Sequence, residues 1–149
     1  MMKIGTAYKK GTGVYLHSSS QTTAGVWVAS SPFLKVETAA TEAAEGEAVI
    51  AVLNASKESV PHPAREEWGQ VFAPMLNLAG ASSLGAFEKD AVCCGLEVED
   101  GQLSIIPHRK RGRNQGYEPI MPKMVKLAFD SSPSEIGAAL EEGFVRCLR

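Results

Sequence analysis

The chain has 149 residues and a formal net charge of −2, and its length fits one domain spanning residues 1–149. With 44% hydrophobic and 21% charged residues, its composition excludes a disordered chain. No stretch approaches the roughly 20 apolar residues that span a bilayer, and no apolar signal segment follows the first residues. We therefore expect a cytoplasmic protein without a membrane partner.

The charges are segregated along the chain. Residues 37–100 contain 12 acids and three bases, a net charge of −9. Residues 108–126 contain six bases and one acid, a net charge of +5. Such asymmetry informs the choice of partners and the steering of their approach, not the fold.

The first third of the chain predicts strands over 3–10, 13–18 and 25–30, which are short, rich in Val, Tyr and Trp, and bounded by Gly or Ser. The polar run SSSQTT at 18–23 is expected to form a hairpin loop. Residues 32–38 can form a further strand.

Two helices are predicted next. Over 41–58 an apolar stripe recurs at helical spacing, and Thr41 or Thr38 can cap its start. Over 63–80 a proline opens the helix and a glycine follows it, but Pro74 must kink or split it because proline has no N–H and collides with the preceding turn. The expected buried face of this second helix consists of Trp68, Val71, Phe72, Met75 and Leu76.

Residues 90–109 predict a β-hairpin, because Asp100-Gly101 is a type I′ turn signal between two strand-forming runs. Cys93 and Cys94 are expected on opposite faces of its first strand. The three cysteines of the chain include no CxxC pair, so the sequence supports no zinc site and no redox dithiol, and we expect no cofactor. Reduced thiols suit the cytoplasm.

The chain ends with a strand over 123–129 and a helix over 130–149. Ser132 and Glu135 form a capping box, and Ile136, Leu140 and Phe144 line one face. The order of elements predicts an α+β fold, a single domain with a mostly antiparallel sheet packed with about three helices.

No catalytic motif is present. The sequence contains no GxSxG, P-loop, HExxH or dinucleotide-binding glycine pattern. His17 is expected to be structural and His62 to face solvent in a loop, and both are far in sequence from His108. Because no residues support one another in an active site, we predict that the protein is not an enzyme. A hydrolase or ligand-binding domain with a pocket invisible in the sequence is the remaining alternative.

The segment PHRKRGRNQGYEP at 107–119 concentrates positive charge on Arg109, Lys110, Arg111 and Arg113. As a surface loop it can be solvated, bind nucleic acid phosphates, or contribute arginines to a protein–protein interface. A nucleic-acid role is disfavoured because the segment has one aromatic residue and most of the chain is acidic. A small RNA-binding module using Arg109–Arg113 is the second hypothesis.

Glu97, Glu99 and Asp100 mark the tip of the predicted hairpin. Glu97 and Glu99 share one face of their strand because side chains alternate along it. Together they can present a negative surface to a basic partner.

Three stretches, taken in order, resemble one family. They are GEAVIAVLNASKESVPHP, AGASSLGAFEKDAVCCGLEVEDGQLSIIP and LAFDSSPSEIGAALEEGFVRC, with Trp68 between the first two. The helix ending in Ala-Ser-Lys, the AFEK turn before a hairpin, the Ile-x-Pro exit and the final Ser-x-x-Glu-Ile-Gly helix are similar to those of immunity proteins from contact-dependent growth inhibition (CDI) systems. The likeness covers about residues 45–148, with Leu84 where a tryptophan is expected.

The resemblance implies a non-catalytic protein of the producing cell that binds and neutralises the toxic C-terminal domain delivered by a neighbouring cell, often a nuclease. A nuclease has a basic surface for phosphate, so an acidic inhibitor face would steer the encounter and block the substrate. The expected toxin-binding residues are Glu97, Glu99, Asp100, Arg109, Lys110, Arg111 and Arg113.

Overall fold

The computed structural model describes residues 2–112 and 116–147. Its centre is a seven-stranded sheet in which every pair of strands is antiparallel, with the order β3-β2-β1-β4-β5-β6 and with β7 also paired to β5. The strands are β1 (Lys3–Lys10), β2 (Gly13–Gln21), β3 (Trp27–Glu37), β4 (Val92–Glu99), β5 (Gln102–Lys110), β6 (Tyr117–Pro119) and β7 (Val125–Ala128).

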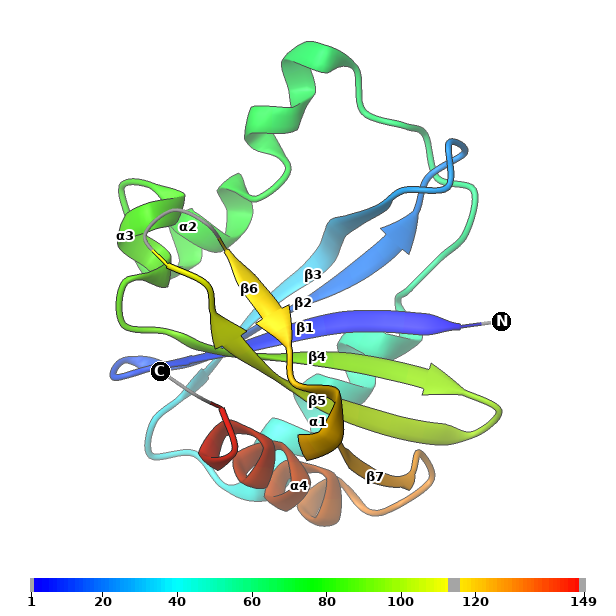
Figure 1. Ribbon diagram of the computed structural model, residues 1–149, viewed down its shortest axis with the longest axis vertical. Coiled ribbons are helices and arrows are strands. Elements are labelled where there is room, and N and C mark those ends of the chain that lie inside the picture. The colour runs from blue at the N-terminus through cyan, green and yellow to red at the C-terminus, as the bar shows by residue number, and fades with distance from the viewer. Residues whose placement is uncertain (1, 113–115, 148–149) are drawn as a thin grey trace.

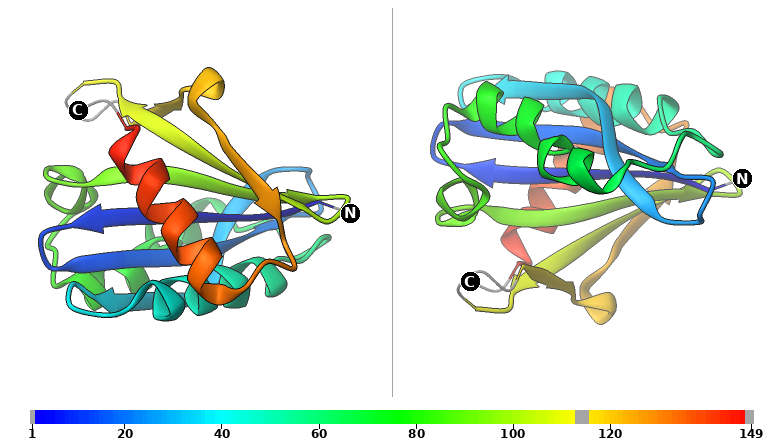
Figure 2. Two further views of the ribbon diagram at one scale, coloured as in Figure 1. Left: turned by 90° about the horizontal axis from the view of Figure 1, so that it is seen from below. Right: turned by 90° about the horizontal axis from the view of Figure 1, so that it is seen from above.

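Helices lie on both faces of this sheet (Figures 1 and 2). The two long helices, α1 (Glu42–Asn54) and α4 (Pro133–Val145), pack together on one face. The short helices α2 (Ala73–Ala79) and α3 (Leu84–Glu88) lie on the other face. Two 3₁₀ turns, η1 (Arg65–Gln70) and η2 (Met121–Lys123), complete the elements. The α+β fold with a mostly antiparallel sheet is thus confirmed.

The main core lies between the sheet and the α1–α4 pair. It contains Val49, Val52 and Leu53 from α1, and side chains such as Leu96 and Ile105 from the strands below them. The helix face predicted for α4 is confirmed, because its three apolar residues are fully or almost fully buried in this core: Ile136, Leu140 and Phe144.

A second, aromatic core fills one end of the opposite face. Tyr8 from β1 and Tyr15 from β2 pack edge-on against Phe87 of α3, and Met75 of α2 is fully buried beside them. Cys93 belongs to this core whereas its neighbour Cys94 belongs to the main core, so the prediction that they face opposite ways is confirmed. Since α2 and α3 cover only this end, the rest of the face is left without a helix.

The N-terminal strands differ from the prediction in extent. The strands predicted over 25–30 and 32–38 merge into the single strand β3, which covers Trp27–Glu37. It runs through a cis Ser31–Pro32 peptide bond and has an irregularity in register opposite His17 and Ser18. The predicted loop 18–23 is wrong in its first four residues, because Ser18–Gln21 pairs with β3 as part of β2. Of the serines there, Ser20 Oγ lies 2.9 Å from Ser30 Oγ, whereas Ser18 Oγ is buried without a hydrogen-bond partner in the described residues.

The predicted helix 63–80 is split, as the position of Pro74 requires. The proline lies in the first turn of α2, where its missing N–H costs nothing, and η1 precedes it as a separate turn. The predicted buried face is correct for Met75 but wrong for Trp68, which is 40% exposed and contacts the His62 ring edge-on. Because the helix is split, Trp68 and Met75 do not share the continuous helical periodicity that would have placed both side chains in one core.

The hairpin prediction is confirmed, with Asp100 and Gly101 both at positive φ in the turn between β4 and β5. The basic segment, however, is not all loop. Arg109 and Lys110 belong to β5, because they pair with Glu118 and Tyr117 of β6. The sequence did not reveal this pairing because the partner strand, β6, has only three residues.

Candidate functional site

The acidic residues of the hairpin line an open groove of about 460 Å³ on the face that carries no long helix. Glu97 and Glu99 project into it from β4, and Asp100 adds a carboxylate from the turn. Sequence alone missed the residues that complete the groove, which are Met2, Gln102, Ser104, Met124 and Lys126. Gln102, Ser104 and Lys126 fall on this face through strand alternation, a signal that becomes readable only once the pairing partners are known.

Strand register explains why these side chains meet. Glu97 pairs with Ile4 of β1 on one side and with Ser104 of β5 on the other, and Ser104 in turn pairs with Lys126 of β7. The four residues therefore form one row across four strands. Within the row, a single half-buried carboxylate lies between neutral side chains, and the lysine stands at its far end.

The basic residues of β5 lie at the other end of the strand. Arg109 Nε donates to Glu118 Oε1 at 2.9 Å, which pairs the two side chains across the β5–β6 ladder. Lys110 Nζ donates to the carbonyl oxygens of Glu88 at 2.7 Å and Lys89 at 3.2 Å, at the C-terminal end of α3. A cation there complements the helix dipole, so Lys110 has a structural partner.

Tyr117 completes this junction between β6 and α3. Its hydroxyl donates to the carbonyl oxygen of Ala91 at 2.9 Å, and burial raises its pKa. Next to it lies a pocket of about 270 Å³ lined also by Lys89, Asp90 and His108. Arg111 is exposed beyond the end of the strand, and Arg113 lies outside the described residues.

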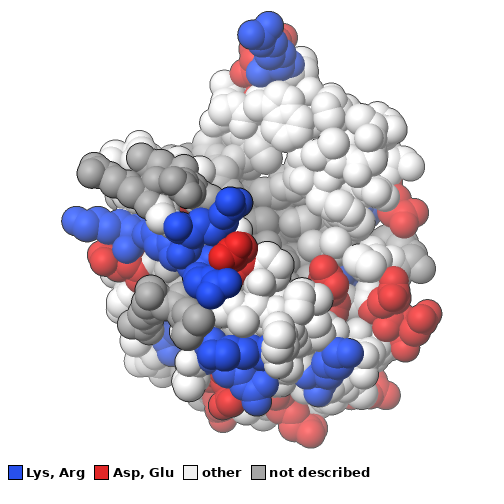
Figure 3. Space-filling view, viewed as in Figure 1, with Lys and Arg blue, Asp and Glu red and all other residues white. Residues whose placement is uncertain are grey.

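The two charged clusters are thus separated along β5, whose nine residues span about 30 Å. Figure 3 shows Lys and Arg gathered mainly on the side where Figure 1 places α3 and β6, and Asp and Glu mainly toward the β4–β5 turn. The surface between them is mostly uncharged, with single charged residues on it. The sequence segregation of charge therefore persists as segregation on one face of the folded molecule.

The three histidines do not assemble into a catalytic group. His17 is buried, with Nδ1 2.7 Å from its neighbour's carbonyl oxygen, and burial lowers its pKa. His62 is exposed in its loop, as predicted, with Nδ1 2.9 Å from Thr22 Oγ1. His108 rests over Gly95, where an added Cβ would lie 2.9 Å from the ring. Within residues 2–112 and 116–147, no group of three His, Cys, Asp or Glu side chains could hold a metal ion.

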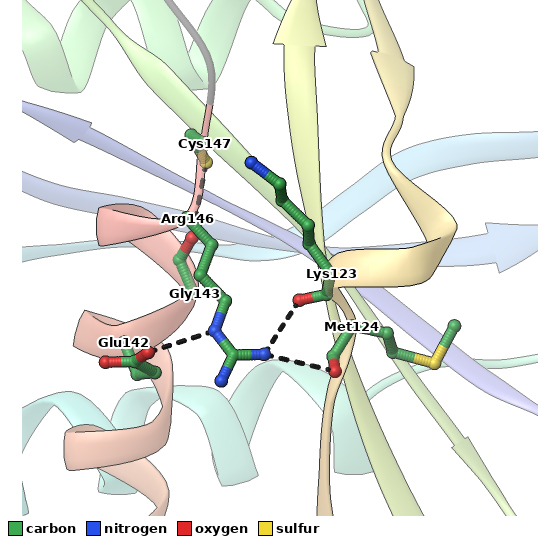
Figure 4. A network of polar contacts seen from close by, with 6 residues as sticks. All are labelled: Lys123, Met124, Glu142, Gly143, Arg146 and Cys147. Carbon is green, nitrogen blue, oxygen red and sulfur yellow. Dashed lines mark hydrogen bonds and ion pairs between the residues drawn. The ribbon is translucent and has the colours of Figure 1, made fainter.

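The end of α4 forms a further polar junction that sequence analysis did not single out (Figure 4). Arg146 Nε donates to Glu142 Oε1 at 2.9 Å, and its Nη1 donates to the carbonyl oxygen of Lys123 at 3.1 Å. The carbonyl oxygen of Met124 lies 3.5 Å from the same nitrogen. The guanidinium thereby fixes the last turn of α4 to η2 and the start of β7.

Comparison with known families decides the identity of this fold. The model of the CDI immunity protein family matches residues 36–147. The chain belongs to the CDI immunity protein family. The matched range contains the hairpin, both charged clusters and the α1–α4 pair, so the resemblance seen in the sequence is confirmed.

Solved structures share the complete CDI immunity fold at low sequence identity. A protein of unknown function from Neisseria meningitidis, NMB0488, superposes with a TM-score of 0.83 at 19% identity, covering 99% of this chain and 96% of that one. A CdiA-CT/CdiI toxin and immunity complex from Yersinia pseudotuberculosis contains a chain with a TM-score of 0.82 at 17% identity, covering 99% of this chain and 98% of that one. No curated protein matches the sequence. In the described part of the immunity protein, no helix is long and apolar enough to cross a membrane.

Proposed function

We propose that this immunity protein binds the C-terminal toxin domain of its own CDI system and neutralises it without catalysis, in the cytoplasm of the producing cell. The observation that carries the proposal is the family match over residues 36–147. The similar fold in a toxin and immunity complex from Yersinia pseudotuberculosis supports it. An inhibitor of this kind needs a pre-formed complementary surface rather than a reactive pocket.

The toxin is, in this proposal, a nuclease. The acidic groove is open and carries three carboxylates from Glu97, Glu99 and Asp100 against one lysine. Lysine and arginine side chains that hold phosphate in a nuclease would find matching charges there. The carboxylates would attract the basic surface of the toxin, and the bound immunity protein would exclude the nucleic acid substrate.

The basic end of β5 would contact carboxylates of the same toxin. Arg109, Lys110, Arg111 and Arg113 were all predicted to contribute. Lys110 already binds the carbonyl oxygens of α3, so its part is to hold the surface in shape. The exposed Arg111 is the best placed of the described bases to reach a partner.

Growth rescue tests the proposal most directly. The toxin domain encoded immediately upstream is expressed in a sensitive host with and without this protein, and the purified pair is analysed for a complex by size exclusion with light scattering. We expect rescue together with a 1:1 complex. Absence of both would reject immunity against that toxin.

Matched charge reversals test the surface. Glu99→Lys in the groove and Glu47→Lys on α1 change the net charge equally, and both residues are exposed. We expect Glu99→Lys to raise the Kd of the complex at least tenfold, and Glu47→Lys to leave it within about twofold. If Glu99→Lys and Glu47→Lys had equal effects on the Kd, the acidic groove would lie outside the interface. If Glu97→Lys and Arg111→Glu also left the Kd unchanged, both charged clusters would lie outside it.

RNA binding through the basic segment is the competing hypothesis, and it makes a different prediction. It requires RNA affinity that falls steeply with salt and that disappears when Arg109, Lys110, Arg111 and Arg113 become alanine. The ion pair of Arg109 with Glu118 argues against it, because a phosphate would have to compete with that carboxylate. RNA affinity with no toxin binding would favour this alternative.

A further inference from the structure

Two cysteine sulfurs meet where the end of α4 touches the centre of the sheet. Cys94 Sγ, on β4, lies 3.8 Å from Cys147 Sγ, which follows the last turn of α4. The pair is 53 positions apart in sequence. Cys147 Sγ also lies 3.3 Å from the carbonyl oxygen of Cys93 and 3.4 Å from that of Gly143. Figure 4 shows the last of these contacts.

The approach of α4 to β4 depends on Gly143. A Cβ at this position would lie 2.7 Å from Ile105 Cγ2 and 3.2 Å from Cys94 Sγ. The missing side chain lets the helix end rest directly on the strand, with Arg146 anchoring the same turn to η2. The two thiols are therefore brought together by the close packing of α4 on β4.

The geometry points to Cys94 and Cys147 as a reversible disulfide site that joins the end of α4 to the central strand β4. Cys93, although adjacent in sequence, faces the aromatic core on the other side of the sheet and stays outside the bond. Closing the bond requires the sulfurs to move from 3.8 Å to about 2.05 Å. Cys147 can make this movement because it lies beyond the last helical residue, Val145.

The reaction is an exchange with a small disulfide such as oxidised glutathione. The thiolate of Cys147, which is 9% exposed, attacks one glutathione sulfur and releases the first glutathione thiol. Cys94 then loses its proton to solvent, attacks the Cys147 sulfur and releases the second. Two protein thiols are oxidised and one glutathione disulfide is reduced to two thiols.

Burial sets the rate of this exchange. Cys94 is fully buried, and its hydrogen bond to Cys147 together with burial raises the pKa of its thiol. Because the thiolate is the nucleophile, the bond forms slowly and in step with local opening of the turn that follows α4. Once formed, it closes a long loop and restricts the unfolded chain.

The test is thiol counting on the folded protein after incubation with oxidised glutathione. The sample is quenched in acid, unfolded in guanidinium with an alkylating agent, and mapped by peptide mass spectrometry. We expect wild-type protein to lose two of its three alkylatable thiols and to yield a linked Cys94–Cys147 peptide pair. The Cys93→Ala variant should form the same bond, whereas Cys94→Ala should form none.

The bond should also shift the urea midpoint upward, and dithiothreitol should reverse that shift. Peptide mapping of the wild type decides the matter even if a variant fails to fold. Recovery of three alkylatable thiols after prolonged oxidation, of glutathione adducts alone, or of a bridge through Cys93 would overturn the inference.

Discussion

At the scale of single residues, two glycines determine how closely α1 and α4 can pack. A Cβ built on Gly46 of α1 would lie 1.8 Å from the carbonyl oxygen of Pro133, and one on Gly137 of α4 would lie 1.8 Å from that of Glu42. Real Cβ atoms do not approach backbone oxygens so closely. The helices therefore meet backbone against backbone, and each glycine fits against the first turn of the opposite helix.

Gly137→Ala should therefore destabilise the protein, although alanine is normally the better helix residue by about 1 kcal/mol. We expect the free energy of unfolding to fall by about 2 kcal/mol or more, because α4 must move away from α1. Urea unfolding monitored by tryptophan fluorescence measures this change. Gly11→Ala is the control, since nothing lies within 4 Å of its added Cβ. A Gly137→Ala variant as stable as the control would show that the helices separate without cost.

At the scale of elements, those with strong local signals were predicted correctly from sequence. The capping box of Ser132 and Glu135 begins α4, and Asp100-Gly101 closes the β4–β5 hairpin, because each signal specifies its own backbone geometry. Elements determined by distant partners were missed. β3 continues through Ser31–Pro32 because β2 pairs along it, and Arg109 joins a strand because β6 returns beside it.

The α1–α4 pair also brings two carboxyl groups together. Glu45 is 8% exposed, and its Oε1 has no hydrogen-bond partner in the described residues. Burial, with Glu141 beside it, raises the pKa of Glu45 to about 8, with Glu42 adding to the effect and Lys9 opposing it. Lys9 forms an ion pair with Glu141, so Glu45 is the group that keeps its proton near neutral pH.

This pKa predicts a loss of stability as pH rises from 4.5 to about 8. The folded pKa of about 8 exceeds the ordinary value of 4.5, so the stabilisation is complete below 4.5 and is lost as pH rises through 8. The wild-type free energy of unfolding should fall relative to Glu45→Gln by up to about 1.4 kcal/mol per pH unit in that window. Urea unfolding across the window checks this, with Glu47→Gln as an exposed control. Parallel curves for wild type and Glu45→Gln would contradict it.

At the scale of the whole molecule, the sequence revealed the segregation of charge but not its arrangement in space. Glu97 and Glu99 were expected to share a face, and their register on β4 confirms it. The sequence could not assign Lys126 and Ser104 to the same groove, because their proximity depends on β7 pairing with the first residues of β5. The register of distant strands, rather than any local pattern, builds the candidate surface.

This arrangement predicts that charge acts mainly on the rate of toxin association. The carboxylates of the groove are open to solvent, so their field steers an approaching basic protein and is screened by salt over about 10 Å at 0.1 M. We expect the association rate constant of wild type to fall at least tenfold between about 0.05 M and about 0.5 M salt. The dissociation rate should change much less.

The Glu97→Lys/Glu99→Lys double variant should associate slowly even at low salt and should lose most of the salt dependence, whereas Glu47→Lys should follow the wild type. Stopped-flow fluorescence or surface plasmon resonance with the purified toxin domain measures both rates. A salt dependence that the double variant retains in full would show that the field steering the toxin comes from another part of the surface. In that case the negative charge along residues 37–100, rather than the groove, would be the steering element.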